Sequence, residues 1–132
     1  MKILLRTVLI ISFVVACHSQ RKSLSSVSNE NFDEFYLKFH NDSLFQLQRI
    51  IFPLEGGKYD YDSEEAWTPK NWQIKKVTVH QVDLQEYSIE FDRSDTLVFE
   101  RIYLPNSGFD FQCRYRLMNG KWYLFYCIDQ NL

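Results

Sequence analysis

The sequence predicts a single α+β domain in which N-terminal helices pack against a long antiparallel sheet. Near the start of the domain, apolar residues recur at helical spacing, at Phe32, Phe35, Tyr36 and Phe39. From residue 75 onward, the apolar pattern alternates with the period of a β-strand. Within this region, Asn119-Gly120 is typical of a two-residue hairpin turn. No internal repeat or second domain is expected.

Two helices are expected at the start of the domain. Asn31 and Glu34 resemble a capping box, which predicts that the first helix begins here. Asp42 can cap a second, short helix through Leu44, Phe45 and Leu47. Thr68-Pro69 resembles an N-cap followed by a proline at the first helical position, which predicts one or two further helical turns.

Strands are expected in most of the remaining chain. Residues 50–54 form the first, and Pro53 makes it an edge or bulged strand. Gly56-Gly57 is expected to turn the chain after it. Later strands are expected around residues 77–79, 87–91 and 97–103, with turns at 92–95 and 105–108 and a hairpin over 109–129.

The register of the last hairpin determines whether two cysteines can form a disulfide. Pairing outward from Asn119-Gly120 places Cys113 opposite Tyr126 and Cys127 opposite Gln112, so the thiols point to opposite faces. A disulfide would then be strained, and two unpaired, mostly buried cysteines are expected, although a bulge could bring them together. The predicted core face carries Phe111, Cys113, Tyr115, Leu117, Trp122, Leu124, Tyr126 and Ile128.

Residues 1–16 are expected to be a lipoprotein signal peptide. Lys2 and Arg6 precede an apolar run, and Val14-Val15-Ala16-Cys17 has the pattern of a lipobox. Cys17 would be acylated and become the first residue of the mature protein. The alternative is an ordinary secretory leader in which the cysteine is accidental. Residues 17–28 are polar and predict a flexible tether, which leaves residues 29–132 as the domain.

The predicted anchor indicates a location in the cell envelope, with the membrane bound through the N-terminal lipid. Because His18 follows the cysteine and no aspartate stands there, we expect the outer membrane, facing the periplasm. Loss of residues 1–16 removes two of 15 basic residues, so 13 remain against 17 acids, a formal net charge of −4. An acidic domain without a basic stripe argues against nucleic acid as a partner.

Residues 42–54, DSLFQLQRIIFPL, resemble a segment of a family of Bacteroides-type envelope lipoproteins of unknown function. Trp67 and Trp72 also match the Trp-containing segment that follows in that family. The order of the elements is similar to the cone of nuclear transport factor 2-like (NTF2-like) proteins. The resemblance covers residues 29–130 and implies this fold and an envelope location, but it transfers no catalytic residue.

Few residues predict chemistry. Asp60, Asp62 and Glu64 open like a calcium loop, but the glycine and the bidentate glutamate of such a loop are missing. A solvated acidic loop and no metal are therefore expected, and the alternative is a weak, low-affinity cation site. No nucleotide or other cofactor motif is found, and no cofactor is expected. The NTF2-like fold also includes acid–base enzymes with a buried carboxylate and a phenol. The nearest equivalents to those groups are His80, Asp83, Tyr103 and Tyr115.

One face of the last hairpin is a candidate for binding. Arg114 and Arg116 lie across from Tyr123 and Phe125, whose rings could stack under the guanidinium groups. The face could be a small anionic pocket or a docking patch, or simply an exposed sheet surface with cross-strand pairs. The expected function is therefore a non-catalytic binding or scaffold domain for an envelope protein or a small ligand. The alternative is an envelope enzyme that uses acid–base residues in the cone cavity.

Overall fold

The computed structural model describes residues 28–132. The predicted signal peptide, the lipidation site Cys17 and nearly all of the tether lie outside the described residues. The domain begins with two helices, α1 (Phe32–Asn41) and α2 (Ser43–Gln48), and a short 3-10 helix, η1 (Val79–Gln81), follows later. No helix in residues 28–132 is long and apolar enough to cross a membrane.

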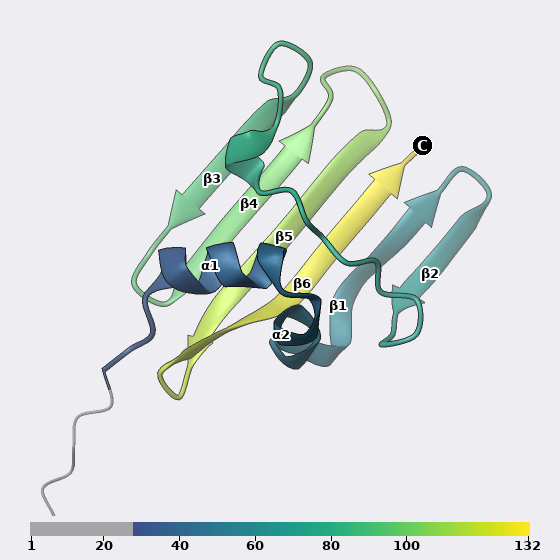
Figure 1. Ribbon diagram of the computed structural model, residues 1–132. Helices are drawn as coiled ribbons and strands as arrows, with labels where there is room; N and C mark the ends of the chain where they lie inside the picture. Colours follow the sequence, from purple (N-terminus) through teal and green to yellow (C-terminus); the bar gives the residue numbers. More distant parts are fainter. Residues whose placement is uncertain (1–27) are drawn as a thin grey trace, which may run out of the picture.

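Six strands form one curved, mixed sheet, which confirms the α+β class (Figure 1). They are β1 (Ile50–Asp60), β2 (Ser63–Trp67), β3 (Ser88–Arg93), β4 (Leu97–Tyr103), β5 (Phe109–Met118) and β6 (Lys121–Asn131). Their spatial order is β2-β1-β6-β5-β4-β3, and every neighbouring pair is antiparallel except β1 and β6. The helices and the segment between β2 and η1 cross one face of this sheet, called the inner face below (Figure 1).

The helix starts agree with the sequence predictions. The Asn31 side chain accepts hydrogen bonds from the amides of Asp33 and Glu34, and it therefore caps α1. Asp42 accepts from the amides of Leu44 and Phe45 in the same way and caps α2. These caps satisfy amide groups that have no partner within the helix. Asp42 ends α1 and caps α2, and its extended backbone separates the two helices.

Two local predictions are wrong, and a third is confirmed in part. Gly56-Gly57 does not turn the chain, because β1 continues to Asp60 and pairs with β6 through both glycines. The prediction at Thr68-Pro69 is confirmed for one turn: the Thr68 hydroxyl oxygen accepts a hydrogen bond from the Asn71 amide, and the Trp72 amide donates to the Thr68 carbonyl. Residues 77–79 pair with no strand, and His80 lies in η1 instead.

The predicted strand at 97–103 is present as β4, and the structure shows which of its residues face inward. The side chains of Val98 and Glu100 are buried, whereas Leu97 is exposed and Phe99 is only partly buried. The apolar residues Leu97, Phe99 and Tyr103 alternate with this buried set along the strand. Both sets alternate, so the period alone did not show which set faces the helices.

The register of the final hairpin contains a β-bulge. From the Asn119-Gly120 turn to the Tyr115–Leu124 pair, the predicted pairing is confirmed. The next pair is Arg114 with Tyr126, so Phe125 is an extra residue on β6. As a result Cys113 lies directly opposite Cys127, and the prediction that the thiols occupy opposite faces is wrong. Both cysteines are buried free thiols.

The core lies between α1 and the inner face of β4, β5 and β6. The Tyr115 ring is its centre, with ring centroids 5.7 to 5.9 Å from those of Phe32, Phe35, Tyr36 and Phe39. All five side chains are at least 96% buried, since their exposed fractions are 4% or less. These apolar and edge-to-face contacts fix α1 on the sheet, and they thereby position the side chains that α1 contributes next to β4.

Candidate functional site

A carboxyl group is buried between α1 and the sheet. Glu100 of β4 is 2% exposed, and its Oε1 atom accepts a hydrogen bond from the Tyr115 hydroxyl at 2.7 Å. Its Oε2 atom accepts a second hydrogen bond from the Tyr36 hydroxyl. Burial raises the pKa of Glu100 to about 7, even though both hydrogen bonds act in the opposite direction. The carboxyl group therefore changes its charge near neutral pH.

The two tyrosines are fixed as donors to this carboxyl group. Burial, together with the negative charge of Glu100, raises the pKa of both Tyr36 and Tyr115 far above the usual value for a phenol. The Tyr36 hydroxyl also accepts a hydrogen bond from the Val79 amide at 3.1 Å. Tyr36 thus connects α1, β4 and η1, and its hydroxyl group already has partners as donor and as acceptor.

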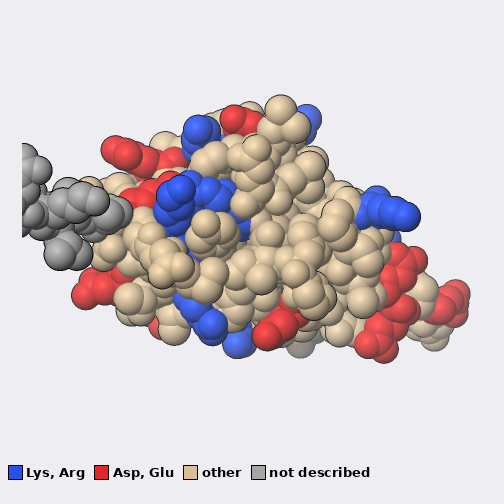
Figure 2. All heavy atoms as spheres, turned by 90° about the horizontal axis from the view of Figure 1, so that it is seen from below, with Lys and Arg blue, Asp and Glu red and all other residues tan. Residues whose placement is uncertain are grey.

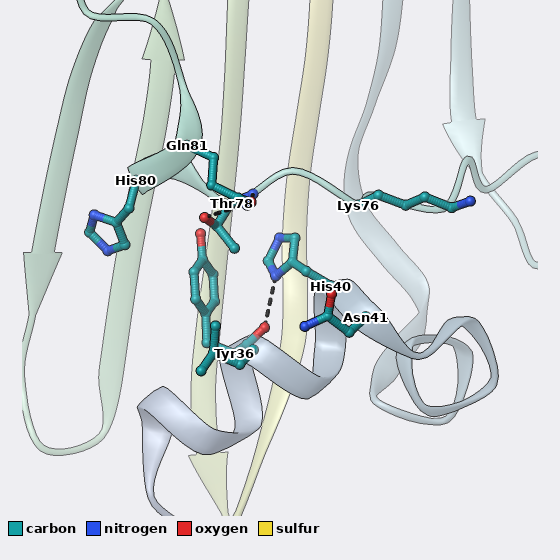
Figure 3. A pocket seen from close by; sticks show the side chains of 8 residues that line it. Tyr36, His40, Asn41, Lys76, Thr78, His80 and Gln81 are labelled. Atoms are coloured by element: carbon teal, nitrogen blue, oxygen red, sulfur yellow. Dashed lines mark hydrogen bonds between the residues drawn. The ribbon is translucent and has the colours of Figure 1, made fainter.

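Next to Tyr36 there is a cavity of about 200 Å³ between α1 and the segment that leads to η1 (Figure 3). Its lining is Tyr36, Leu37, His40, Asn41, Lys76, Thr78, His80 and Gln81. Imidazole, hydroxyl and amide groups therefore surround it, while none of these lining residues is an aspartate or a glutamate. Glu100 lies behind the Tyr36 ring and does not line the cavity.

His40 gives this cavity a defined hydrogen-bond acceptor. Its Nδ1 atom lies 2.9 Å from the Tyr36 carbonyl oxygen, as the dashed line in Figure 3 shows. A carbonyl can only accept, so the neutral ring carries its proton on Nδ1 and leaves a lone pair on Nε2. Burial lowers the pKa of His40, which favours this neutral form.

The structure separates the four residues predicted as acid–base candidates. Tyr115 is in the core and contacts Glu100, and His80 is exposed at the rim of the cavity, with its ring 6.3 Å from that of Tyr36. Asp83 is exposed and accepts a hydrogen bond from the Gln85 amide in a local turn. Tyr103 lies on the other side of the sheet, under the Arg101 guanidinium group. The four candidates therefore do not form one site.

Sequence reasoning did not identify Glu100, Tyr36 or His40 as site residues. A signal for Glu100 was present, because it alternates with Val98 in a strand whose inward positions are otherwise apolar. A charged residue at an inward position is costly unless it is paired or neutral, and it is therefore informative. Tyr36 was assigned to the core from its spacing, and nothing in the sequence indicated that its hydroxyl meets Glu100.

The predicted binding face lies on the side of the sheet opposite α1, called the outer face below. Arg114 lies over the ring of Tyr126 at 4.5 Å, and Arg116 lies over the ring of Phe125 at 4.2 Å. Tyr126 had been expected in the core, and the bulge instead turns it towards the outer face. Tyr123 contacts a different guanidinium group, that of Arg49, at 5.3 Å.

A concave pocket of about 510 Å³ lies on this outer face. Its lining is Glu55, Asp92, Ser94, Leu97, Val98, Phe99, Arg114, Arg116 and Phe125. Three of the four residues of the predicted binding face therefore line one pocket, and Tyr123 lies outside it. Arg114 and Arg116 are exposed, and neither forms a salt bridge with any residue in the range 28–132.

Acidic side chains are concentrated on the hairpin formed by β1 and β2. Acidic side chains gather at the right-hand end of the molecule in Figure 2, the side on which β1 and β2 lie in Figure 1. The loop residues Asp60, Asp62 and Glu64 belong to this hairpin. Asp60 forms a salt bridge with Lys58 at 3.0 Å. No group of three metal-ligating side chains occurs within residues 28–132.

Comparisons with known proteins agree on the fold. The model of one protein family, whose description names no function, matches residues 30–131. A solved protein from Bacteroides uniformis ATCC 8492 is 21% identical, with a TM-score of 0.59 and coverage of 79% of this chain and 78% of that chain. No curated protein sequence matches the chain.

Two further solved structures are similar. An NTF2-like protein from Bacteroides fragilis NCTC 9343 is 21% identical, with a TM-score of 0.54, and the match covers 79% of this chain but only 48% of that one. A cystatin-like protein from Bacteroides caccae ATCC 43185 is 19% identical, with a TM-score of 0.57 and 77% coverage of both chains. The expected resemblance to Bacteroides proteins with an NTF2-like fold is confirmed. The chain belongs to the uncharacterised family whose model matches residues 30–131, and it shares its fold with an NTF2-like protein from Bacteroides fragilis.

Proposed function

We propose that this protein is a lipid-anchored, non-catalytic binding protein of the bacterial cell envelope, which binds a small anionic ligand in the outer-face pocket. The observation that carries the proposal is the pair of exposed guanidinium groups of Arg114 and Arg116, held over aromatic rings beside a concavity of about 510 Å³. Pockets that bind small molecules have volumes of about 300–1,000 Å³. The anchor is proposed from the sequence pattern that ends at Cys17.

The chemistry of the pocket favours an anionic group attached to an apolar body. A guanidinium group presents a planar fork of donors that matches a carboxylate or a phosphate. Stacking on Tyr126 and Phe125 holds the two forks in place, which lowers the conformational entropy lost when a ligand binds. Phe99 and Leu97 supply apolar surface in the same pocket.

The same pocket disfavours polyanions. Two carboxylates, Glu55 and Asp92, line it together with the two arginines, so its formal charges cancel. A nucleic acid needs a surplus of positive charge to displace its counterions. A small molecule with one anionic group needs only the local fork, and it can avoid the two carboxylates. This charge balance supports a small ligand over a nucleic acid.

The cavity beside Tyr36 gives less support to the enzyme alternative. Both oxygens of Glu100 already accept hydrogen bonds from tyrosines, and the carboxyl group does not line the cavity. A general base must come within hydrogen-bond reach of the proton that it removes. Glu100 would have to exchange the Tyr36 hydroxyl for a substrate, and α1 and η1 would both have to move, because Tyr36 is bonded to Val79.

Binding is tested with benzoate and with inorganic phosphate as probes, by following amide chemical shifts during titration of the full chain. The expected result is that benzoate shifts amides of β5 and β6 around the outer-face pocket, and that Arg114→Gln with Arg116→Gln removes these shifts. Lys70→Gln removes one charge in a loop outside the pocket and is the control. Equal shifts in the double variant, or shifts confined to the cavity beside His40, would contradict the proposal.

The anchor is tested separately. In cells given a labelled fatty acid, we expect label on the chain and recovery of the chain in the membrane fraction. Cys17→Ser removes the only sulfur of the predicted lipobox and should abolish both. Cys113→Ser removes a thiol from the sheet and should leave the label unchanged. An unlabelled wild-type chain in the soluble fraction would contradict the proposed anchor.

A further inference from the structure

Cys113 and Cys127 are placed for a covalent bond. They are directly opposite each other on the antiparallel strands β5 and β6. The Cα atoms of such pairs lie about 4.5–5.5 Å apart, within the range of about 4.4–6.8 Å found for disulfides. Their Sγ atoms lie 2.9 Å apart. Both side chains are on the inner face and are 2% and 0% exposed, so each thiol has the other as its near neighbour.

The β-bulge at Phe125 creates this pairing. Without the extra residue, Cys113 would face Tyr126, and the two sulfurs would lie on opposite sides of the ribbon. The bulge also turns Tyr126 towards the outer face, where its ring lies under the Arg114 guanidinium group. The same irregularity thus aligns two thiols on one face and supplies an aromatic support for Arg114 on the other.

We propose that Cys113 and Cys127 form a cross-strand disulfide when the chain folds in the presence of a disulfide oxidant. One cysteine thiolate attacks the oxidant R–S–S–R, forms a mixed disulfide and releases one RS⁻, which takes up a proton. The second thiolate attacks the cysteine sulfur of the mixed disulfide and releases the second RS⁻. The two cysteine thiols are oxidised, two hydrogen atoms leave the protein, and one oxidant is reduced to two thiols.

The timing of this reaction follows from burial. In the folded sheet the thiols are closed off from solvent, so oxidation takes place before the hairpin is covered by α1 and η1. An oxidising compartment outside the cytoplasm supplies disulfide oxidants, and to this extent the formation of the bond in the cell rests on the proposed export. The bond would then fix the register of the bulge that supports Arg114 and Arg116.

The experiment maps the disulfide in the full chain by mass spectrometry. In one arm, the reduced, unfolded chain is refolded with oxidised glutathione; in the other, the chain is isolated from cell envelopes. Free thiols are blocked with N-ethylmaleimide in denaturant before digestion. Trypsin cuts after Arg114, Arg116 and Lys121, so the two cysteines fall in different peptides. The expected result is a linked pair of peptides in both arms, which separates on reduction.

The outcomes distinguish the disulfide from the proposed location. Blocked thiols on both cysteines in the refolded chain would overturn the disulfide. A link in the refolded chain with blocked thiols in the cellular chain would support the pairing and contradict export to an oxidising compartment. Cys113→Ser is the matched control, in which Cys127 should be fully blocked. Linkage of either residue mainly to Cys17 would also overturn the proposal.

Discussion

The Tyr115 hydroxyl donates a hydrogen bond to Glu100 Oε1 at 2.7 Å, within a core of aromatic and aliphatic side chains. Together with the Tyr36 hydroxyl on Oε2, it satisfies both oxygens of a carboxyl group that is shielded from water. No cation in residues 28–132 forms a salt bridge with Glu100. The stability of the domain should therefore depend on whether this group is charged.

Glu100 predicts a loss of stability as the pH rises. Its pKa is about 7 in the folded protein against a usual 4.5, so the folded state binds more protons than the unfolded state between these values. The contribution of Glu100 is favourable below pH 4.5 and is lost as the pH rises through about 7. The difference corresponds to about 3 kcal/mol. Urea unfolding from pH 4.5 to 8 measures it.

The variant Glu100→Gln keeps the shape of the side chain and removes its titration. Its free energy of unfolding should lose most of this pH dependence, whereas the exposed control Glu64→Gln should retain the wild-type curve. If the wild type and Glu100→Gln have parallel curves across the range, the carboxyl group does not titrate near neutral pH.

His40 predicts the opposite pH dependence, in which the free energy of unfolding falls as the pH is lowered. Burial lowers its pKa below the usual value of 6.5, so the unfolded state binds more protons than the folded state. Its contribution is present above pH 6.5 and is lost as the pH falls through the lower folded pKa. In a Glu100→Gln background, the unfolding curves should retain this slope without the opposing contribution of Glu100. His40→Asn retains a donor for the Tyr36 carbonyl and should reduce this pH dependence of the free energy of unfolding. If the double variant Glu100→Gln, His40→Asn loses stability in acid as much as Glu100→Gln alone, the slope does not come from His40.

The fold could be predicted from local signals that agree with one another. The caps at Asn31 and Asp42, the helical spacing of the α1 aromatics and the Asn119-Gly120 turn each have a short-range physical cause, and each was correct. Gly56 was misread because a glycine at positive φ is as typical of a bulge as of a turn. Only the parallel pairing of β1 with β6 distinguishes a bulge from a turn here, and the two strands are far apart in the sequence.

The candidate sites depended on which face each strand turns inward. The shared face of Arg114, Arg116 and Phe125 was predicted correctly because the hairpin turn fixes the pairing nearest to it. Beyond Leu124 the bulge reverses the faces, so the relations of Tyr126 and of the two cysteines were not accessible. Glu100 was missed because both faces of β4 carry apolar residues, and the choice between them is made by packing against α1.

Gln46 predicts a large loss of stability on truncation. Its fully buried amide donates to the carbonyls of Phe39 and Lys75 and accepts from the Trp72 indole and the Lys75 amide. Gln46→Ala leaves these groups without their partner and should reduce the free energy of unfolding by about 3–5 kcal/mol. Gln48→Ala, exposed on the same helix, is the control. Similar urea midpoints for the two variants would show that water replaces the amide.

Gly56 predicts that the bulged part of β1 tolerates no side chain. Its φ is +92°, a conformation that residues with a Cβ rarely adopt, and an added Cβ would lie 2.1 Å from the Cys127 carbonyl oxygen. That oxygen also accepts the Trp67 indole hydrogen bond at 2.8 Å, so it cannot move without a loss on β2. Gly56→Ala should therefore reduce the free energy of unfolding by about 3 kcal/mol or more.

Gly108→Ala is the informative comparison for this position. An added Cβ there would also collide with backbone, 1.8 Å from the Leu132 carbonyl oxygen, but Leu132 follows the end of β6 and is 58% exposed. Exposed backbone outside the sheet can move aside, so the loss should be about 1 kcal/mol or less. Urea unfolding of both variants, with equal m-values, measures the difference. Equal losses would mean that β1 yields as easily as the exposed backbone at Leu132, and the bulge would then be too soft to hold Glu55 beside the outer-face pocket.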